Sequence, residues 1–162
     1  MELPERQEEF KRLPRAISAE IYAVDHRDPK GVWNVGNVSI CLADGKEEIW
    51  TNGGGFAQPK VAMNGMAGWL WGVHKTKEGW ASGGLRVVYN SKSISSIKPT
   101  GAYVLAWNFV EDGASIVVKS RGVKGDISVE KFITKTGKSQ GKFNIGKDDP
   151  EKAEEWVKPL LE

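Results

Sequence analysis

Short runs of alternating apolar and polar residues cover most of the chain. From Ala16 onward, the side chains of I-S-A-E-I-Y-A-V alternate between the two classes. This two-residue period is typical of a half-buried β-strand. Residues 32–42 repeat the pattern, with a slip in phase near Gly36 that predicts a bulge or a bend. Similar runs predict further strands at 47–51, 93–97, 102–110, 115–120 and 127–134.

Turn residues separate these runs from one another. Typical turn compositions are found at 25–31 (D-H-R-D-P-K-G), 43–46 (A-D-G-K), 98–101 (K-P-T-G) and 111–114 (E-D-G-A). Short strands at regular spacing with turns between them are typical of an antiparallel β-sandwich or β-barrel. The chain is therefore predicted to be mainly β, and its length favours a single domain over residues 1–162.

Only the two ends of the chain have helical features. Residues 1–14 are predicted to form a short helical arm, because Pro4 suits a first helical position, glutamates come early and Pro14 ends the segment. Residues 149–162 are predicted to form a C-terminal helix, with Asp149 as its cap. Apolar residues follow at helical spacing at Ala153, Trp156, Val157, Leu160 and Leu161.

The most aromatic part of the chain, residues 66–110, reads as a β-hairpin. Two arms of alternating small and bulky residues flank the polar turn H-K-T-K-E-G, in which Gly79 supplies the turn residue. Period two places Trp69 and Trp71 on one face, so they should be buried or exposed together.

Core positions are favoured for these two tryptophans and for Trp107, whereas Trp80 follows the turn and is expected to be exposed. Asn108 lies on the opposite face of its strand from Trp107. The candidate ligand-binding residues of this region are Trp69, Trp71, Trp80, Tyr89, Trp107 and Asn108.

Composition narrows the class of protein. The chain has 19 glycines and seven tryptophans, and its single cysteine, Cys41, excludes an intramolecular disulfide. Cys41 lies between Ile40 and Leu42 and is expected to be a small core residue. The polar start of the sequence does not resemble a signal peptide, and no apolar run is long enough to span a membrane. These features favour a soluble protein, compatible with the cytoplasm, and leave its location open.

Charge is distributed unevenly, although the formal net charge is only +2. A basic segment from Lys119 to Lys147 contains lysines and one arginine against only Asp126 and Glu130, and an acidic tail follows it. Such a segment can meet anionic groups, or it can simply be the solvated face of strands and turns. A nucleic acid is disfavoured, because no aromatic stacking positions alternate with the lysines.

The sequence does not predict catalysis, a metal site or a cofactor. His26 and His74 lie in polar turns, and nothing near Cys41 lowers the pKa of a thiol. Asp25, His26 and Asp28 lack the further ligands of a zinc site. The glycines at 53–55 lack the spacing of a phosphate-binding loop. A mechanism based on spatially paired carboxylates stays open.

From Arg15 to Arg121, the order of features resembles the actinoporin-like cytolysins and their related lectins. Residues in a similar order to that family's are Arg15, Ile17, Trp33, Pro59, Trp69, Trp71, Lys75, Ala81, Gly83, Gly84 and Tyr89, followed by a strand at 102–110. The resemblance implies a β-sandwich with an N-terminal helix and recognition of phosphocholine headgroups. In the family, an aromatic cluster follows this last strand, whereas this chain has F-V-E-D-G-A-S-I-V-V.

Two functions are compatible with these patterns. The leading hypothesis is a non-catalytic, membrane-active or lectin-like protein that recognises a glycan or a lipid headgroup through its tryptophan-containing hairpin. The alternative is a closed β-barrel, either a lipocalin-like carrier or a cyclase or isomerase, whose cavity for an apolar small molecule is lined by Trp33, Trp50, Trp71 and Trp107. A third possibility is a protein-interaction module that uses sheet edges. Each of the three readings is compatible with an oligomer.

Overall fold

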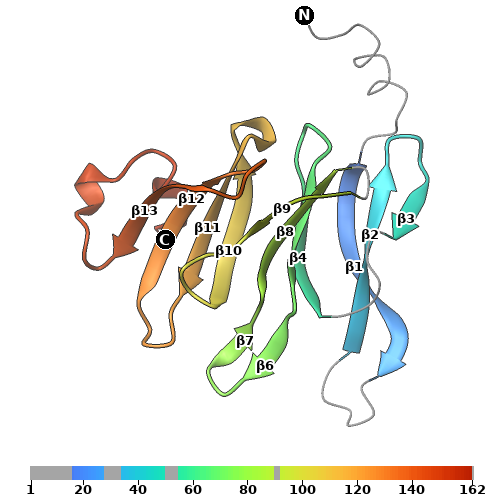
Figure 1. Cartoon of the computed structure of the whole chain (residues 1–162), viewed down its shortest axis with the longest axis horizontal. Coiled ribbons are helices and arrows are strands. Elements are labelled where there is room, and N and C mark those ends of the chain that lie inside the picture. The colour runs from blue at the N-terminus through green and yellow to red at the C-terminus, as the bar shows by residue number, and fades with distance from the viewer. Residues whose placement is uncertain (1–15, 28–33, 50–54, 90–91, 162) are drawn as a thin grey trace, which may run out of the picture.

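The computed structural model describes residues 16–27, 34–49, 55–89 and 92–161 (Figure 1). Within these ranges the strands are β1 (Ala16–Arg27), β2 (Asn34–Leu42), β3 (Glu47–Ile49), β4 (Phe56–Val61), β5 (Ala67–Trp71), β6 (His74–Thr76), β7 (Gly79–Ala81), β8 (Gly84–Tyr89), β9 (Lys92–Ile97), β10 (Tyr103–Val110), β11 (Ser115–Arg121), β12 (Ile127–Ile133) and β13 (Ser139–Ile145). Short 3-10 turns are η1 (Glu111–Gly113), η2 (Pro150–Lys152) and η3 (Lys158–Leu160).

All paired strands in the described part of the chain are antiparallel neighbours. The strand orders are β1-β2-β3, β4-β5-β8-β9 and β10-β11-β12-β13, with β6-β7 as a small separate ribbon. The prediction of a mainly β, antiparallel protein is therefore confirmed. An irregularity is also found where the sequence pattern slips near Gly36. Gly36 and Val35 of β2 pair with Ala23 and His26 of β1, so the register shifts between these two pairs.

The β4-β5-β8-β9 sheet lies between the other two large sheets. Ala67 and Trp69 of β5 pack with Val38 and Ile40 of β2, whereas Leu70 packs with residues of β10–β12. Both faces of β5 are thus buried, which explains why its sequence A-G-W-L-W lacks polar residues. In Figure 1, β10–β13 lie on one side of β8 and β9, and β1–β3 lie on the other.

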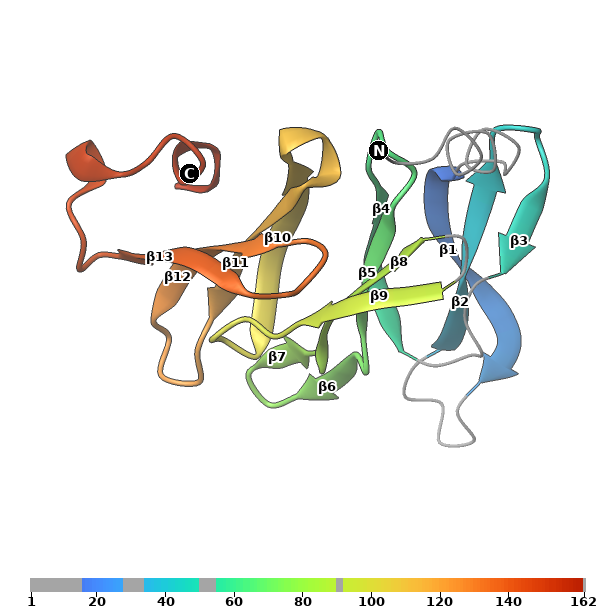
Figure 2. The same cartoon turned by 45° about the horizontal axis from the view of Figure 1, so that its top comes forward.

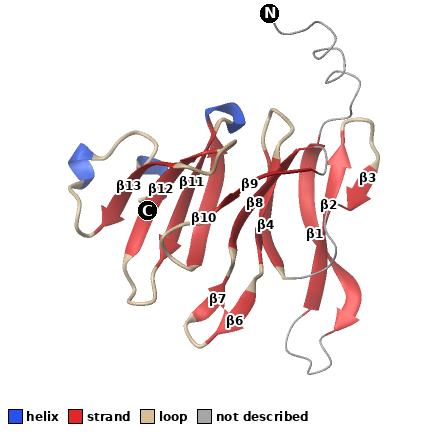
Figure 3. Cartoon of the chain, viewed as in Figure 1, coloured by secondary structure: helices blue, strands red, loops and turns tan. Residues whose placement is uncertain are grey.

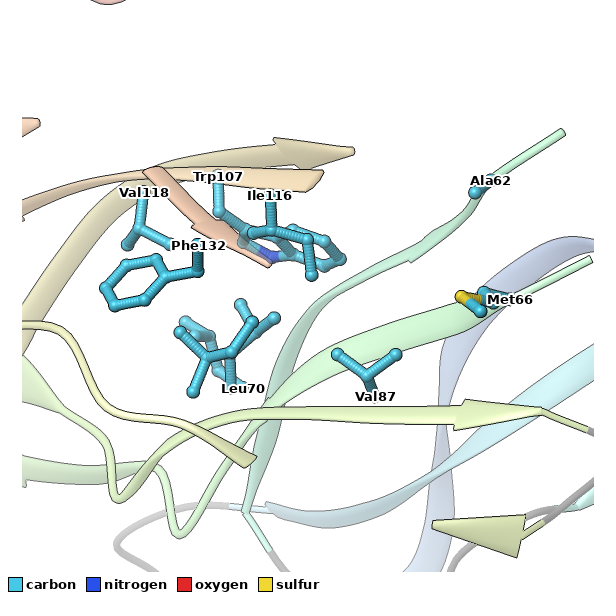
Figure 4. Packing of buried hydrophobic residues seen from close by; sticks show 10 residues of the cluster. Ala62, Met66, Leu70, Val87, Trp107, Ile116, Val118 and Phe132 are labelled. Carbon is cyan, nitrogen blue, oxygen red and sulfur yellow. The ribbon is translucent and has the colours of Figure 1, made fainter. Parts of the chain in front are cut away.

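The largest core fills the space between the middle sheet and the β10–β13 sheet. Figure 4 shows side chains from the two sheets pointing toward one another, among them Trp107, Ile116 and Phe132 from one side and Leu70 and Val87 from the other. Trp107 is completely buried, and its indole N–H donates to the carbonyl of Gln58 at 2.9 Å. Gln58 lies at a register shift in β4 with a positive φ of 50°, and this bulge turns its carbonyl toward the core.

The C-terminal segment covers the outer face of the β10–β13 sheet. Val157 is buried against Val117, Val129 and Phe143 of the sheet, with Trp156 packed beside it. In Figure 2 this segment lies on the opposite side of the sheet from β9.

The prediction of a C-terminal α-helix over 149–162 is wrong. Asp149 caps as predicted by accepting from the Glu151 N–H, but the helical turn ends at Ala153, where ψ is 138°. A second 3-10 turn follows at Lys158–Leu160, and Figure 3 shows these two short pieces of the C-terminal segment in blue. Pro159 cannot donate a backbone hydrogen bond, and the apolar residues reach the sheet without a continuous helix. The predicted N-terminal helical arm lies outside the described residues.

Candidate functional site

The aromatic hairpin consists of two paired pieces. The arms pair as β5 with β8, and the distal ribbon pairs β6 with β7. In the ribbon, Lys75 lies directly opposite Trp80, so the two side chains are neighbours on one face. Lys75 is exposed and Trp80 is 50% exposed, whereas Ala81 on the other face is buried. The outward face of the ribbon is therefore a lysine–tryptophan pair.

The inward face of the ribbon is attached to the β10–β13 sheet through Tyr103. This tyrosine is buried, and its hydroxyl lies 3.1 Å from the hydroxyl of Thr76 and donates to a carboxylate oxygen of Glu78 at 3.4 Å. The Thr76 hydroxyl in turn donates to the Gly79 carbonyl at 2.9 Å and accepts from the Glu78 N–H at 3.2 Å. These contacts fix the turn that carries Trp80.

Arg121, at the end of β11, attaches the same turn to the sheet from a second direction. Its guanidinium lies 4.5 Å from the centre of the Tyr103 ring and donates to the Glu78 carbonyl at 2.8 Å. Tyr103 and Arg121 are cross-strand partners, so the register of β10 and β11 brings them together. The tip is therefore ordered before any ligand arrives, which lowers the entropy cost of binding.

The turn between β11 and β12 lies at the same end of the molecule as the ribbon (Figure 1). Val123 in this turn is 71% exposed, and Lys124 beside it is exposed too. We call residues 74–81 and 121–126 together the hairpin end. Its charges are those of Lys75, Lys77, Arg121 and Lys124 against Glu78 and Asp126, so its formal charge is positive.

The six predicted ligand-binding residues do not form one surface. Trp69 is 1% exposed and Trp107 is 0% exposed, and they lie on opposite faces of the middle sheet. Trp80 is exposed, as its place after the turn predicts. Trp71 and Tyr89 are half-buried, and Asn108 is exposed on the outer face of β10.

The prediction that Trp69 and Trp71 are buried or exposed together is only partly confirmed. The two rings share a face, as period two predicts, but Trp71 is less buried than Trp69. Of the four tryptophans predicted to line a barrel cavity, Trp33 and Trp50 lie outside the described residues. Trp107 is packed in the core, with Phe109 against it at a centroid distance of 5.1 Å.

The sequence did not reveal the residues that support Trp80. Lys75 is predictable once the two-residue turn fixes the register, because the residue opposite Trp80 then follows by counting. Tyr103 and Arg121 are not predictable in this way, since their contacts with the ribbon join segments far apart in the chain.

Most of the basic segment lies away from the hairpin end. Lys131 on β12 forms an ion pair with Glu111 at 2.6 Å, and Lys135, Lys138, Lys142 and Lys147 are exposed around β13 and its flanking turns. The hydrogen bond from Lys131, and a second one from the Ser115 hydroxyl, hold the pKa of Glu111 below its usual value. The segment is therefore partly neutralised at its centre.

Comparisons with known proteins leave the chain without an identified family. No family model, curated protein or solved structure matches it. The resemblance to actinoporin-like cytolysins therefore stays a prediction. In the described ranges, no helix is long and apolar enough to cross a bilayer. No three His, Cys, Asp or Glu side chains among the described residues gather closely enough to hold a metal ion.

Proposed function

We propose that the chain is a non-catalytic binding protein that contacts lipid headgroups through the hairpin end. The observation that carries this proposal is the outward pair of Lys75 and Trp80, on a ribbon whose other face is fixed to Tyr103 and Arg121. An indole with one apolar and one polar edge suits the boundary between headgroups and acyl chains, and lysines beside it attract anionic lipids.

The shape and charge of the hairpin end favour a lipid surface over a glycan. Trp80 and Val123 are exposed at the end of the molecule, on two turns held together by Arg121. A sugar is usually held in a concave site by several acceptors and donors around an aromatic ring. The charged groups around Trp80 are mainly cations, which suit phosphate groups better than sugar hydroxyls.

Sedimentation with vesicles tests this proposal. The purified protein is mixed with vesicles of phosphatidylcholine alone and with vesicles that also contain phosphatidylserine. We expect binding to the mixed vesicles that weakens as salt is added, because exposed charges are screened. The triple variant Lys75→Gln, Lys77→Gln, Lys124→Gln should bind about 100-fold more weakly, since each lysine near an anionic surface contributes about 1 kcal/mol.

Trp80→Ala tests the aromatic part of the contact and should also weaken vesicle binding. The matched control is Lys135→Gln combined with Lys138→Gln and Lys147→Gln, which removes the same charge from the exposed β13 side of the molecule. Equal losses in the two triple variants would mean that net charge alone drives binding, and would refute the assignment to the hairpin end.

Two further outcomes separate the ligand classes. Binding to phosphatidylcholine alone that depends on Trp80 would support the headgroup specificity that the actinoporin resemblance implies. Binding to a glycan array through Trp80, without any binding to vesicles, would replace the lipid with a sugar. The absence of binding in all of these assays would refute the proposed function.

A further inference from the structure

A second group of polar side chains lies on the face of the middle sheet that is turned toward β1 and β2. Trp69 of β5 and Arg86 of β8 are direct cross-strand partners, and Trp71 lies two residues further along β5 on the same face. Trp69 is almost completely buried, whereas Trp71 and Arg86 are half-buried. The three side chains thus extend from the interior of the molecule toward its surface.

Each of these three side chains has a buried N–H without an acceptor. The atoms are Nε1 of Trp69, Nε1 of Trp71 and Nε of Arg86, and none finds a hydrogen-bond partner among the described residues. Buried polar groups in folded proteins are nearly always paired, so each exception needs an explanation. Three exceptions on neighbouring positions of one sheet face point to a common cause.

The surrounding contacts hold Trp71 and Arg86 in place. The Arg86 guanidinium lies 5.1 Å from the centre of the Trp71 ring. A Cβ atom at Gly83, just before β8, would lie 2.8 to 2.9 Å from three atoms of the same ring, so the indole rests directly on this glycine. Stacking on an aromatic face leaves the edge of a guanidinium free to donate hydrogen bonds.

The charge of Arg86 is also uncompensated within the described part of the chain. Neither the ion pair of Lys131 with Glu111 nor that of Lys158 with Glu155 involves Arg86. The neighbour of Arg86 on β9 is Ser96, which is exposed and neutral. The group therefore offers donors and one positive charge, without an ion-pair partner among the described residues.

We infer that Trp69, Trp71 and Arg86 form a binding site for an oxyanion, the carboxylate or phosphate group of a small ligand. Such a group accepts hydrogen bonds only, carries the complementary charge and satisfies several donors at once. A neutral sugar hydroxyl suits the site less well, because it brings a donor that finds no acceptor there. We place the entry of the anion at Trp71 and Arg86, the two half-buried residues of the group.

This site is independent of the hairpin end, since its residues belong to β5 and β8 and do not include Trp80. A protein that fails to bind vesicles would therefore not contradict the oxyanion site. A protein that fails to bind oxyanions would likewise not contradict the proposed lipid binding.

The test follows the indole N–H signals in heteronuclear NMR spectra of the full chain. Sodium phosphate, sodium sulfate and sodium acetate are each titrated against sodium chloride at constant ionic strength, with Trp69→Phe and Trp71→Phe used to assign the signals. We expect the Trp69 and Trp71 signals to move saturably with at least one oxyanion. The Trp107 signal should stay in place, because its N–H is already bonded to Gln58.

Arg86→Met removes the charge while keeping an unbranched apolar chain, and should weaken oxyanion binding about 10- to 100-fold. Arg86→Lys keeps the charge without the planar donors, so its affinity for oxyanions should lie between those of the wild type and Arg86→Met.

A saturable shift with phosphate but not acetate, or the reverse, identifies the ligand class and supports the site. The inference is overturned if the wild-type indole signals respond no more to oxyanions than to chloride, or if Arg86→Met binds as tightly as the wild type. The wild-type titration tests oxyanion binding even if a variant fails to fold.

Discussion

Trp107 and Trp71 each lie directly against a glycine. The indole of Trp107 contacts Gly68 across the main core, and the indole of Trp71 contacts Gly83. Neither glycine has the positive φ that would require it for backbone reasons, so the ring is what excludes a side chain. At the scale of single residues, glycine here creates space for an aromatic neighbour.

Gly68→Ala should lower the free energy of unfolding by about 1–3 kcal/mol, the usual cost of overpacking a core. The new Cβ atom would lie 2.9 Å from Trp107 and 3.2 Å from the backbone oxygen of Arg86. Urea unfolding followed by circular dichroism measures the effect. In a Trp107→Phe background, which removes the contacting ring atom, the same substitution should cost less, and additive losses would show that Trp107 is not the obstacle.

Glu111 should make stability depend on pH. Its pKa is lowered by the hydrogen bonds from Lys131 and Ser115, so the ionised form stabilises the folded state. This contribution is present above the pKa that Glu111 has in the unfolded chain, and it is lost as the pH falls through the lower pKa of the folded state.

Glu111→Gln should therefore reduce the urea midpoint at about pH 7 and have a smaller effect at about pH 3. Glu155→Gln is a suitable control, because Glu155 also pairs with a lysine but shows no such hydrogen bond from a hydroxyl. An equal decrease of the urea midpoint at both pH values would show that the ionisation of Glu111 does not stabilise the folded state.

At the scale of elements, the β6–β7 ribbon depends on contacts from outside itself. Two three-residue strands are too short to be stable alone, and Tyr103 and Arg121 supply the missing attachment. The order of this ribbon is thus determined by β10 and β11, elements that follow it in the chain.

Tyr103→Phe should loosen the ribbon while changing global stability by only about 0.5–1.5 kcal/mol, the net contribution of a typical hydrogen bond. We expect faster acrylamide quenching of Trp80 and faster protease cleavage at Lys75 or Lys77. Asn108→Ala, at an exposed position of β10, should leave both readouts unchanged. Unchanged quenching in Tyr103→Phe would show that the ribbon is ordered without this hydroxyl.

The elements also show how far the sequence predicts the structure. Period two and turn composition located most strands, because these signals are local and one face of each strand is buried. The same reasoning predicted one turn at 25–31, whereas β1 extends through Arg27 by pairing with β2. The C-terminal apolar spacing suggested a helix, although contact with Val117 and Phe143 needs no continuous helix.

Site residues were harder to predict than strands. Exposure of Trp80 follows from its position beside a turn, but the pairing of Trp69 with Arg86 depends on the register of β5 and β8. A one-residue shift in that register would place Arg86 on the other face. Alternation alone therefore assigned Trp69 and Trp71 to a face without revealing the arginine beside them.

At the scale of the whole molecule, each large sheet needs a cover for its apolar faces. The middle sheet is covered by the two flanking sheets, and the outer face of the β10–β13 sheet is covered by the C-terminal segment. This segment has little regular structure, so its attachment depends on buried apolar side chains such as Val157.

Val157→Asp should detach the C-terminal segment, because a buried unpaired carboxylate costs more than the contact provides. Exposure of Val117, Val129 and Phe143 should then increase binding of a hydrophobic dye and promote aggregation. Lys158→Glu, at the exposed neighbouring position, should change neither. Wild-type dye binding in Val157→Asp would show that the sheet does not need this cover.

The position of β5 has a consequence for local opening. Its backbone pairs with β4 on one side and β8 on the other, while both of its faces are covered by other sheets. Movement of one flanking sheet alone therefore leaves the backbone hydrogen bonds of β5 in place. Amide exchange in β5 should therefore proceed only through global unfolding, so that its slowest rates report the stability of the entire molecule.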